Sequence, residues 1–169
     1  MININQFKNN FKGGARKNKF SINIVKLNNK FNSILVQSAS IPQFSLDALT
    51  VHSIAGKIKV AGGREVPDWD VTVMLDEDVA DNGINELENW QLQARQMMSA
   101  EGSNDAHGVL NGYKSDAYVY QLDQKGNTIA RYKLEGIWPK EIGQREFDYT
   151  DDDIVTCSIT FSIDNVIRL

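Results

Sequence analysis

Only one cysteine occurs among the 169 residues, and proline is scarce as well, with three. A lone cysteine cannot form an intramolecular disulfide, and it excludes the multi-cysteine sites that often hold structural zinc. No run of about 18 consecutive apolar residues is present, and the N-terminus lacks the apolar stretch of a secretion signal. We therefore expect a protein that is made in a reducing cytoplasm and has no membrane contact.

Signatures of catalysis are missing too. The sequence contains no Gly-x-Ser-x-Gly, no Gly-x-x-x-x-Gly-Lys-Ser/Thr and no Gly-x-Gly-x-x-Gly motif. His52 and His107 are far apart and lack the spacing of metal ligands, and Cys157 falls on the apolar face of an expected strand. We predict no catalytic residue, no cofactor and no metal.

Acidic residues are scarce in the first part of the chain, and basic residues are outnumbered in the rest. Residues 1–64 carry ten Lys and Arg against one acid, whereas residues 65–169 carry eight against 21, for a formal total of −4. The acidic surplus disfavours tight binding of nucleic acid by the whole domain. Unlike charges in the two halves suit subunits that meet head to tail, although charges interleaved in space would give the same count.

The hydrophobic pattern predicts a mainly β protein: an antiparallel sandwich or small barrel with one flanking helix. Residues 1–19 are expected to form a basic arm, and residues 20–169 one domain. A helix is expected over about 83–100, where Ile84, Leu87 and Trp90 begin an apolar stripe. We expect a long loop over about 38–53. The expected strands are Phe20–Ile24 paired in a hairpin with Phe31–Gln37, Ile54–Ala61 ended by Gly62-Gly63, Trp69–Leu75, Ala117–Leu122 paired with Thr128–Leu134, and Val155–Asp164.

Several segments then carry a resemblance to a known family. Val60-Ala-Gly-Gly-Arg64 leads into Asp68-Trp-Asp-Val-Thr-Val-Met74, and Trp90 follows on the helix. Leu134-Glu-Gly-Ile-Trp-Pro139, the strand Ile154–Asp164 and Ser38–Pro42 also match in order and spacing. Over roughly residues 19–167 the chain resembles the tail tube proteins of contractile-tailed bacteriophages, which are related to type VI secretion tube proteins.

The resemblance implies a structural virion protein whose hexameric rings stack into the inner tail tube. That tube conducts DNA during ejection without binding it specifically, and its partners are further copies, the tail sheath protein, and baseplate and tail terminator proteins. Assembly is expected in the host bacterial cytoplasm. The residues expected at contacts between rings or subunits are Ile41, Phe44, Leu46, Lys57, Lys59 and Arg64. Acidic patches of the lumen or surface are expected at Asp70, Asp76, Glu77, Asp78, Asp151, Asp152 and Asp153.

The residues leave three other interpretations open. A paralogous ring protein that initiates or terminates the tube would share the fold, and so would the tube of a phage-derived injection device. A carbohydrate-binding β-sandwich is a different class, for which exposed Tyr118, Tyr120 and Tyr132 on neighbouring strands are the feature in favour. Cross-strand packing explains these tyrosines more simply.

For the lumen of the expected tube, the candidates are the polar faces with Asp70 and Thr72, or with Thr156, Ser158 and Thr160.

Overall fold

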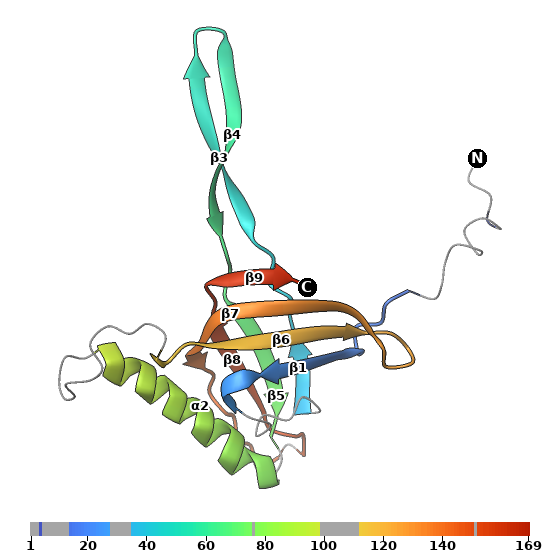
Figure 1. The fold of residues 1–169 in the computed structure, drawn as a ribbon. Coiled ribbons are helices and arrows are strands. Elements are labelled where there is room, and N and C mark those ends of the chain that lie inside the picture. The colour runs from blue at the N-terminus through green and yellow to red at the C-terminus, as the bar shows by residue number, and fades with distance from the viewer. Residues whose placement is uncertain (1–3, 5–13, 28–34, 76, 99–111, 151) are drawn as a thin grey trace.

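The computed structural model describes residues 4, 14–27, 35–75, 77–98, 112–150 and 152–169. Within these residues the fold consists of a seven-stranded sheet, a separate two-stranded hairpin and one long helix (Figure 1). In chain order the elements are β1 (Phe20–Ile24), the 3-10 turn η1 (Val25–Leu27), β2 (Val36–Ala39), β3 (Ser45–Ser53), β4 (Gly56–Glu65), β5 (Trp69–Met74), α2 (Glu77–Met98), β6 (Ser115–Leu122), β7 (Thr128–Ile142), β8 (Thr156–Ser162) and β9 (Asn165–Arg168).

Strand β7 divides the large sheet into two halves. The strand order is β1-β6-β7-β8-β5-β2, all neighbours run antiparallel, and β9 pairs with β7 as well. Residues 128–137 of β7 pair with β6, whereas residues 138–142 pair with β8. The two halves enclose a common core with α2 packed against it, which confirms the predicted mainly β sandwich or small barrel with one helix.

The bend in β7 depends on Gly136. This residue has a φ of +66°, a conformation that side-chain-bearing residues rarely adopt. A Cβ placed there would stand 2.1 Å from Oδ2 of Asp164, whose carboxylate also forms an ion pair of 2.6 Å with Lys114. Glycine is therefore required here for conformation and for space.

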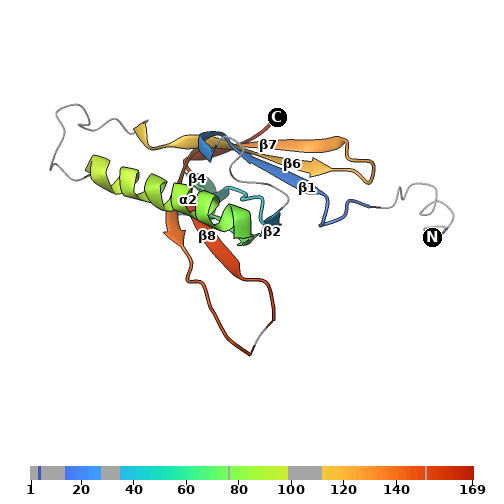
Figure 2. The same ribbon diagram turned by 90° about the horizontal axis from the view of Figure 1, so that it is seen from below.

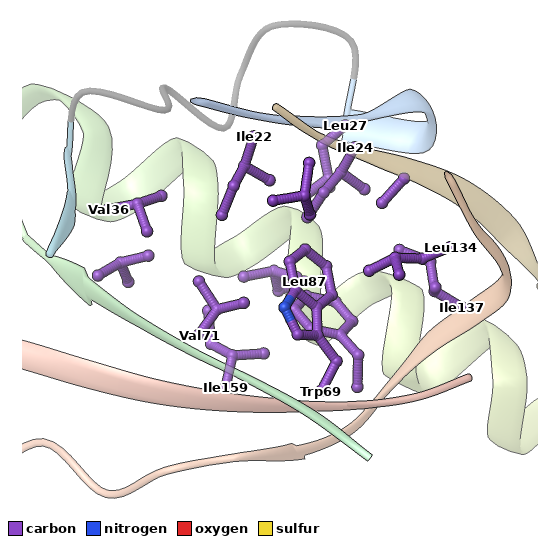
Figure 3. Close-up of a cluster of buried hydrophobic side chains, with 14 of the residues drawn as sticks. Ile22, Ile24, Leu27, Val36, Trp69, Val71, Leu87, Leu134, Ile137 and Ile159 are labelled. Carbon is purple, nitrogen blue, oxygen red and sulfur yellow. The ribbon is translucent and has the colours of Figure 1, made fainter. Parts of the chain in front are cut away.

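The core is built from the alternating faces that the sequence predicts for β5 and β8. Trp69 and Phe161 are fully buried with ring centroids 5.3 Å apart, and Trp90 of α2 lies 6.2 Å from Phe161. Figure 3 shows Leu87 of the helix close to Trp69 in this cluster of buried side chains. The indole N–H of Trp90 donates to the carbonyl oxygen of Tyr113, so the buried polar atom is satisfied. Helix and sheet are thus held together by aromatic contacts.

Three expectations for individual elements are corrected. Phe20–Ile24 is a strand, but β1 pairs with β6 and β2 pairs with β5, so the two do not form a hairpin with each other. The helix begins at Glu77 rather than near residue 83, because its first turns carry polar residues that leave no apolar stripe in the sequence. The expected loop over 38–53 contains the nine-residue strand β3, and β4 continues through Gly62 and Gly63 to Glu65.

Candidate functional site

The hairpin formed by β3 and β4, called the projecting hairpin below, extends away from the body of the molecule (Figure 1). These two strands pair with each other from Ser45 opposite Glu65 to Ser53 opposite Gly56. Among the described residues they form a sheet of their own, separate from the seven-stranded sheet. An isolated two-stranded hairpin is marginally stable in water, so a partner surface would stabilise it.

The register of the projecting hairpin sorts its side chains onto two faces. On one face Leu49 lies opposite Val60, and Val51 lies opposite Ile58. All four are exposed, with exposed fractions from 45% for Val60 to 59% for Ile58. About half of this apolar face is therefore open to solvent in the described part of the single chain, and apolar surface of this kind is typical of a contact site.

The opposite face of the projecting hairpin is basic. Thr50 lies opposite Lys59 and His52 opposite Lys57, and all four are exposed. Residues 48–61 include no acid. The outer part of the hairpin therefore presents an apolar surface on one side and positive charge on the other.

Strands β3 and β4 approach closely at Gly62, near the end of the hairpin that joins the body, which we call its foot. A Cβ on Gly62 would stand 3.0 Å from both the carbonyl oxygen of Asp47 and Cγ of Leu49. The register shifts at this point, between the pairs Leu46 with Arg64 and Ala48 with Ala61. Such a bulge increases strand twist, which redirects the outer part of the hairpin relative to its foot.

The predicted contact residues are only partly brought together. Lys57 and Lys59 lie on the outer hairpin, and Phe44 and Leu46 are exposed near its foot. Ile41 is half-buried and packs against the core. The guanidinium of Arg64 contacts its own chain in two ways, lying 4.2 Å from the Phe44 ring centroid and donating a 3.2 Å hydrogen bond to the carbonyl oxygen of Val166.

A polar face runs along β5 and β8 on the side opposite the core. Asp70 lies opposite Thr160 and Thr72 opposite Ser158. The Thr160 hydroxyl donates a 2.7 Å hydrogen bond to Oδ1 of Asp70. This face is hydrophilic, and it contains both sets of residues that the sequence offers as candidates for the lumen.

The connection from β7 to β8 carries a second surface, of which the sequence predicted only the acidic residues Asp151, Asp152 and Asp153. We define the β7–β8 segment by its described residues, 143–150 and 152–155. It extends from the body in Figure 2. Phe147 is 80% exposed, and Tyr149 and Ile154 are exposed too. These apolar side chains stand among carboxylates, a pattern visible in the sequence as Glu146-Phe-Asp-Tyr.

The β7–β8 segment borders a hollow of about 1070 Å³. Its conformation is set by local contacts: both the N–H and the hydroxyl of Thr150 donate 2.9 Å hydrogen bonds to Oδ1 of Asp148. The Arg145 guanidinium lies 3.5 Å from the Glu88 carboxylate on α2. The residues that line the hollow are Gln37, Met74, Gln144, Glu146, Phe147, Asp148, Tyr149, Asp153, Ile154, Val155, Thr156 and Ser158.

The predicted acidic patches are distributed over three places. Asp70 belongs to the polar face of β5, and Asp152 and Asp153 belong to the exposed part of the β7–β8 segment. Glu77 and Asp78 lie in the first turn of α2. Asp76 and Asp151 lie outside the described residues.

In the described parts of the chain, the side chains that could bind a metal ion or act as catalysts do not converge on one site. No cluster of three or more His, Cys, Asp or Glu with the geometry to hold a metal ion occurs there. His52 stands exposed on the projecting hairpin, and His107 lies outside the described residues. Cys157 is buried in the core as predicted, and burial raises the pKa of its thiol. Within the same described parts, no helix has the length and apolar composition that crossing a membrane requires.

Comparison with known proteins now decides the family. Residues 16–167 match the model of the family described as T4-like virus tail tube protein gp19. The chain belongs to this tail tube protein family. Over 152 residues, 89% of each chain, it is 29% identical to the tail tube protein gp19 of Enterobacteria phage T4.

Solved structures share the fold of this family member. A chain of the sheath/tube terminator of the extracellular contractile injection system PVC aligns with a TM-score of 0.68 at 17% identity, covering 94% of this chain and 98% of that one. A chain of the PVC sheath-tube complex aligns with a TM-score of 0.64, also at 17% identity, covering 100% and 99%. The fold predicted from the family resemblance is therefore confirmed.

Proposed function

We propose that this tail tube protein forms hexameric rings that stack into the inner tube of a contractile tail, with the projecting hairpin as the contact between rings. The observation that carries this proposal is the exposed apolar face of Leu49, Val51, Ile58 and Val60 on a hairpin that stands clear of the body. A hairpin of this kind gains stability when a neighbouring copy covers its apolar face.

Ring closure is supported by the edges of the half-sheet β7-β8-β5-β2. Within the described residues, β2 has a strand partner only on its β5 side, and residues 138–142 of β7 pair only with β8. Exposed edges of this kind invite pairing with another chain, and closure into a barrel removes them. Joining β2 of one copy to the end of β7 in the next would extend the half-sheet around a ring.

The part of the polar face of β5 and β8 around Asp70 and Thr160 is the proposed lumen wall, whereas Thr156 and Ser158 of the same strand β8 line the hollow beside the β7–β8 segment. This wall presents hydroxyls and the carboxylate of Asp70, and a surface without excess positive charge does not hold phosphate groups. DNA would therefore pass along the wall without specific binding. This role requires no catalysis, cofactor or membrane contact.

The proposed partners follow from the same role. The structural neighbours come from a sheath-tube complex and a sheath/tube terminator, which supports a tail sheath protein and a terminator as partners of this chain. A chain of the anti-feeding prophage baseplate, with a TM-score of 0.67, supports a baseplate partner in the same way. We place assembly in the cytoplasm of the host bacterium.

Electron micrographs of the purified protein at high concentration test the proposal. We expect six-fold rings with a central hole, and tubes of stacked rings after a nucleating baseplate is added. Monomers alone under both conditions would contradict it. The number of copies per particle distinguishes a tube protein, present in many rings, from an initiator or terminator present in one.

A further inference from the structure

The projecting hairpin and the β7–β8 segment leave the half-sheet β7-β8-β5-β2 at opposite ends. The hairpin lies between β2 and β5, next to the end where Ala39 pairs with Val71 and where β5 begins at Trp69. The β7–β8 segment leads into Thr156, which pairs with Met74 at the other end of β5. A copy displaced along the strand direction therefore brings its hairpin toward the β7–β8 segment of its neighbour.

The two surfaces are complementary in charge. Residues 143–155 of the sequence hold five carboxylates against one arginine, whereas residues 48–61 hold Lys57 and Lys59 and no acid. Within the β7–β8 segment, Glu146 and Asp152 are exposed and described, as are both lysines. Opposite charges on docking surfaces guide association and fix its register.

The two surfaces also match in their apolar parts. Phe147, Tyr149 and Ile154 are strongly exposed beside the hollow of about 1070 Å³, and the hairpin offers Ile58 and Val60 at about half exposure. Ile58 stands between Lys57 and Lys59 in the strand, so apolar and basic side chains alternate between the two faces. A hairpin that enters the hollow can meet aromatic rings with one face and carboxylates with the other.

We propose that the hollow beside the β7–β8 segment receives the projecting hairpin of a second copy of this chain. The contact is heterologous, because one end of each copy meets the other end of the next, and it repeats without limit along a stack. This inference rests on the proposed function, since it names the surface on which the inter-ring hairpin docks. Lys57 and Lys59 face Glu146 and Asp152 in this contact.

Charge reversal on each side, followed by mixing, tests the pairing. One variant carries Lys57→Glu and Lys59→Glu, and the other carries Glu146→Lys and Asp152→Lys. Asp148 is left intact because its carboxylate holds the turn at Thr150. Each variant alone opposes like charges, so we expect rings but a loss of tube mass of about tenfold or more. A matched control, Lys17→Glu with Lys125→Glu, changes exposed lysines elsewhere and should form tubes like the wild type.

Mixing the two reversed variants should restore tubes, because every hairpin then finds a segment of opposite charge. Tubes from either variant alone at the wild-type level, or no recovery on mixing, would overturn the pairing while leaving a ring-forming tube protein intact. If the wild type itself forms neither rings nor tubes, the proposed function fails, and this inference fails with it.

A cross-link keeps the test decisive if a reversed variant does not fold. Lys57→Cys combined with Asp152→Cys should give ladders of covalent multimers when tubes are oxidised, and each single cysteine variant should give none. Native Cys157 can remain because it is buried. Absence of the ladder in tubes of the double variant would contradict the docking site.

Discussion

Arg64 lies over Phe44 at the foot of the projecting hairpin, with its guanidinium carbon 4.2 Å from the ring centroid. The same side chain reaches β9 through its hydrogen bond to the Val166 carbonyl. Both contacts join the hairpin to the body, since Phe44 immediately precedes β3 and Val166 belongs to the main sheet. We infer that Arg64 fixes the direction in which the hairpin projects.

Replacing Arg64 with alanine should loosen the hairpin more than it destabilises the fold. An exposed cation–π contact contributes about 0.5–1 kcal/mol, so the free energy of unfolding should fall by roughly that amount. Amide hydrogen exchange in β3 and β4 should become faster. Lys59→Ala, on the exposed face of β4, is the matched control and should leave exchange at the hairpin foot unchanged. Equal protection of the hairpin amides from exchange in Arg64→Ala and the wild type would contradict the inference that Arg64 fixes the direction of the hairpin.

Leu49→Ser combined with Val60→Ser should prevent stacking while the subunit stays folded. Both side chains are about half exposed in the single chain, so each substitution should cost less than about 1 kcal/mol of folding stability. Negative-stain images should show rings without tubes, and the melting temperature should stay close to that of the wild type. Thr50→Ser, on the opposite face, should leave tubes unaffected. Tubes of normal length from the double variant would show that this apolar face is not the contact.

Gly136→Ala should be strongly destabilising. The substitution adds the cost of a left-handed conformation to a clash with Asp164, and we expect about 2–4 kcal/mol in total. Gly126→Ala is the matched control: its φ is +89°, but a Cβ there meets nothing within 4 Å, so only about 1 kcal/mol should be lost. Thermal denaturation measures both. Equal losses at the two positions would mean that the contact with Asp164 relaxes without cost.

Asp123 should make stability depend on pH in acid. Its carboxylate accepts hydrogen bonds from the Asn127 side chain at 3.0 Å and from the Asn127 and Lys125 backbone N–H groups, and these bonds lower its pKa. A carboxyl whose pKa is lowered by folding stabilises the protein above its unfolded pKa, and this contribution is lost as the pH falls through the folded pKa.

The difference in unfolding free energy between the wild type and Asp123→Asn should therefore be constant near neutral pH and shrink below about pH 4. Denaturant titrations across pH 2–7 measure it. Asn127→Ala removes one donor to the carboxylate and should weaken the pH dependence in part. A difference that does not change with pH would rule out this role for Asp123.

The sequence predicted the parts of the fold whose side chains alternate between core and solvent. Trp69, Val71 and Val73 alternate with polar residues because β5 has one buried face, and β8 behaves in the same way. Strand β3 escaped prediction because both faces of its hairpin are exposed, so burial imposes no simple period on it, whereas β4 was expected in part as Ile54–Ala61. Gly62 and Gly63 were interpreted as a strand end, yet they form a bulge within β4.

The candidate site was predictable only in part. Alternation of Lys57, Ile58 and Lys59 is visible in the sequence, but the pairing of Ile58 with Val51 depends on the register of a strand that was not expected. Strand β1 pairs with β6, which is far away in the sequence, so no turn motif between them predicts the pairing. The sequence shows Phe147 and Tyr149 among carboxylates, a pattern typical of an exposed surface. Their position at the end of the sheet opposite the hairpin depends on the topology of the sheet.

A cryo-electron microscopy reconstruction of the assembled particle tests the central claim most directly. We predict stacked rings in which the projecting hairpin of each copy crosses to the next ring and the face with Asp70 and Thr160 lines the lumen. A reconstruction in which the hairpin remains against its own ring, or in which that face lies on the outside of the tube, would contradict the account.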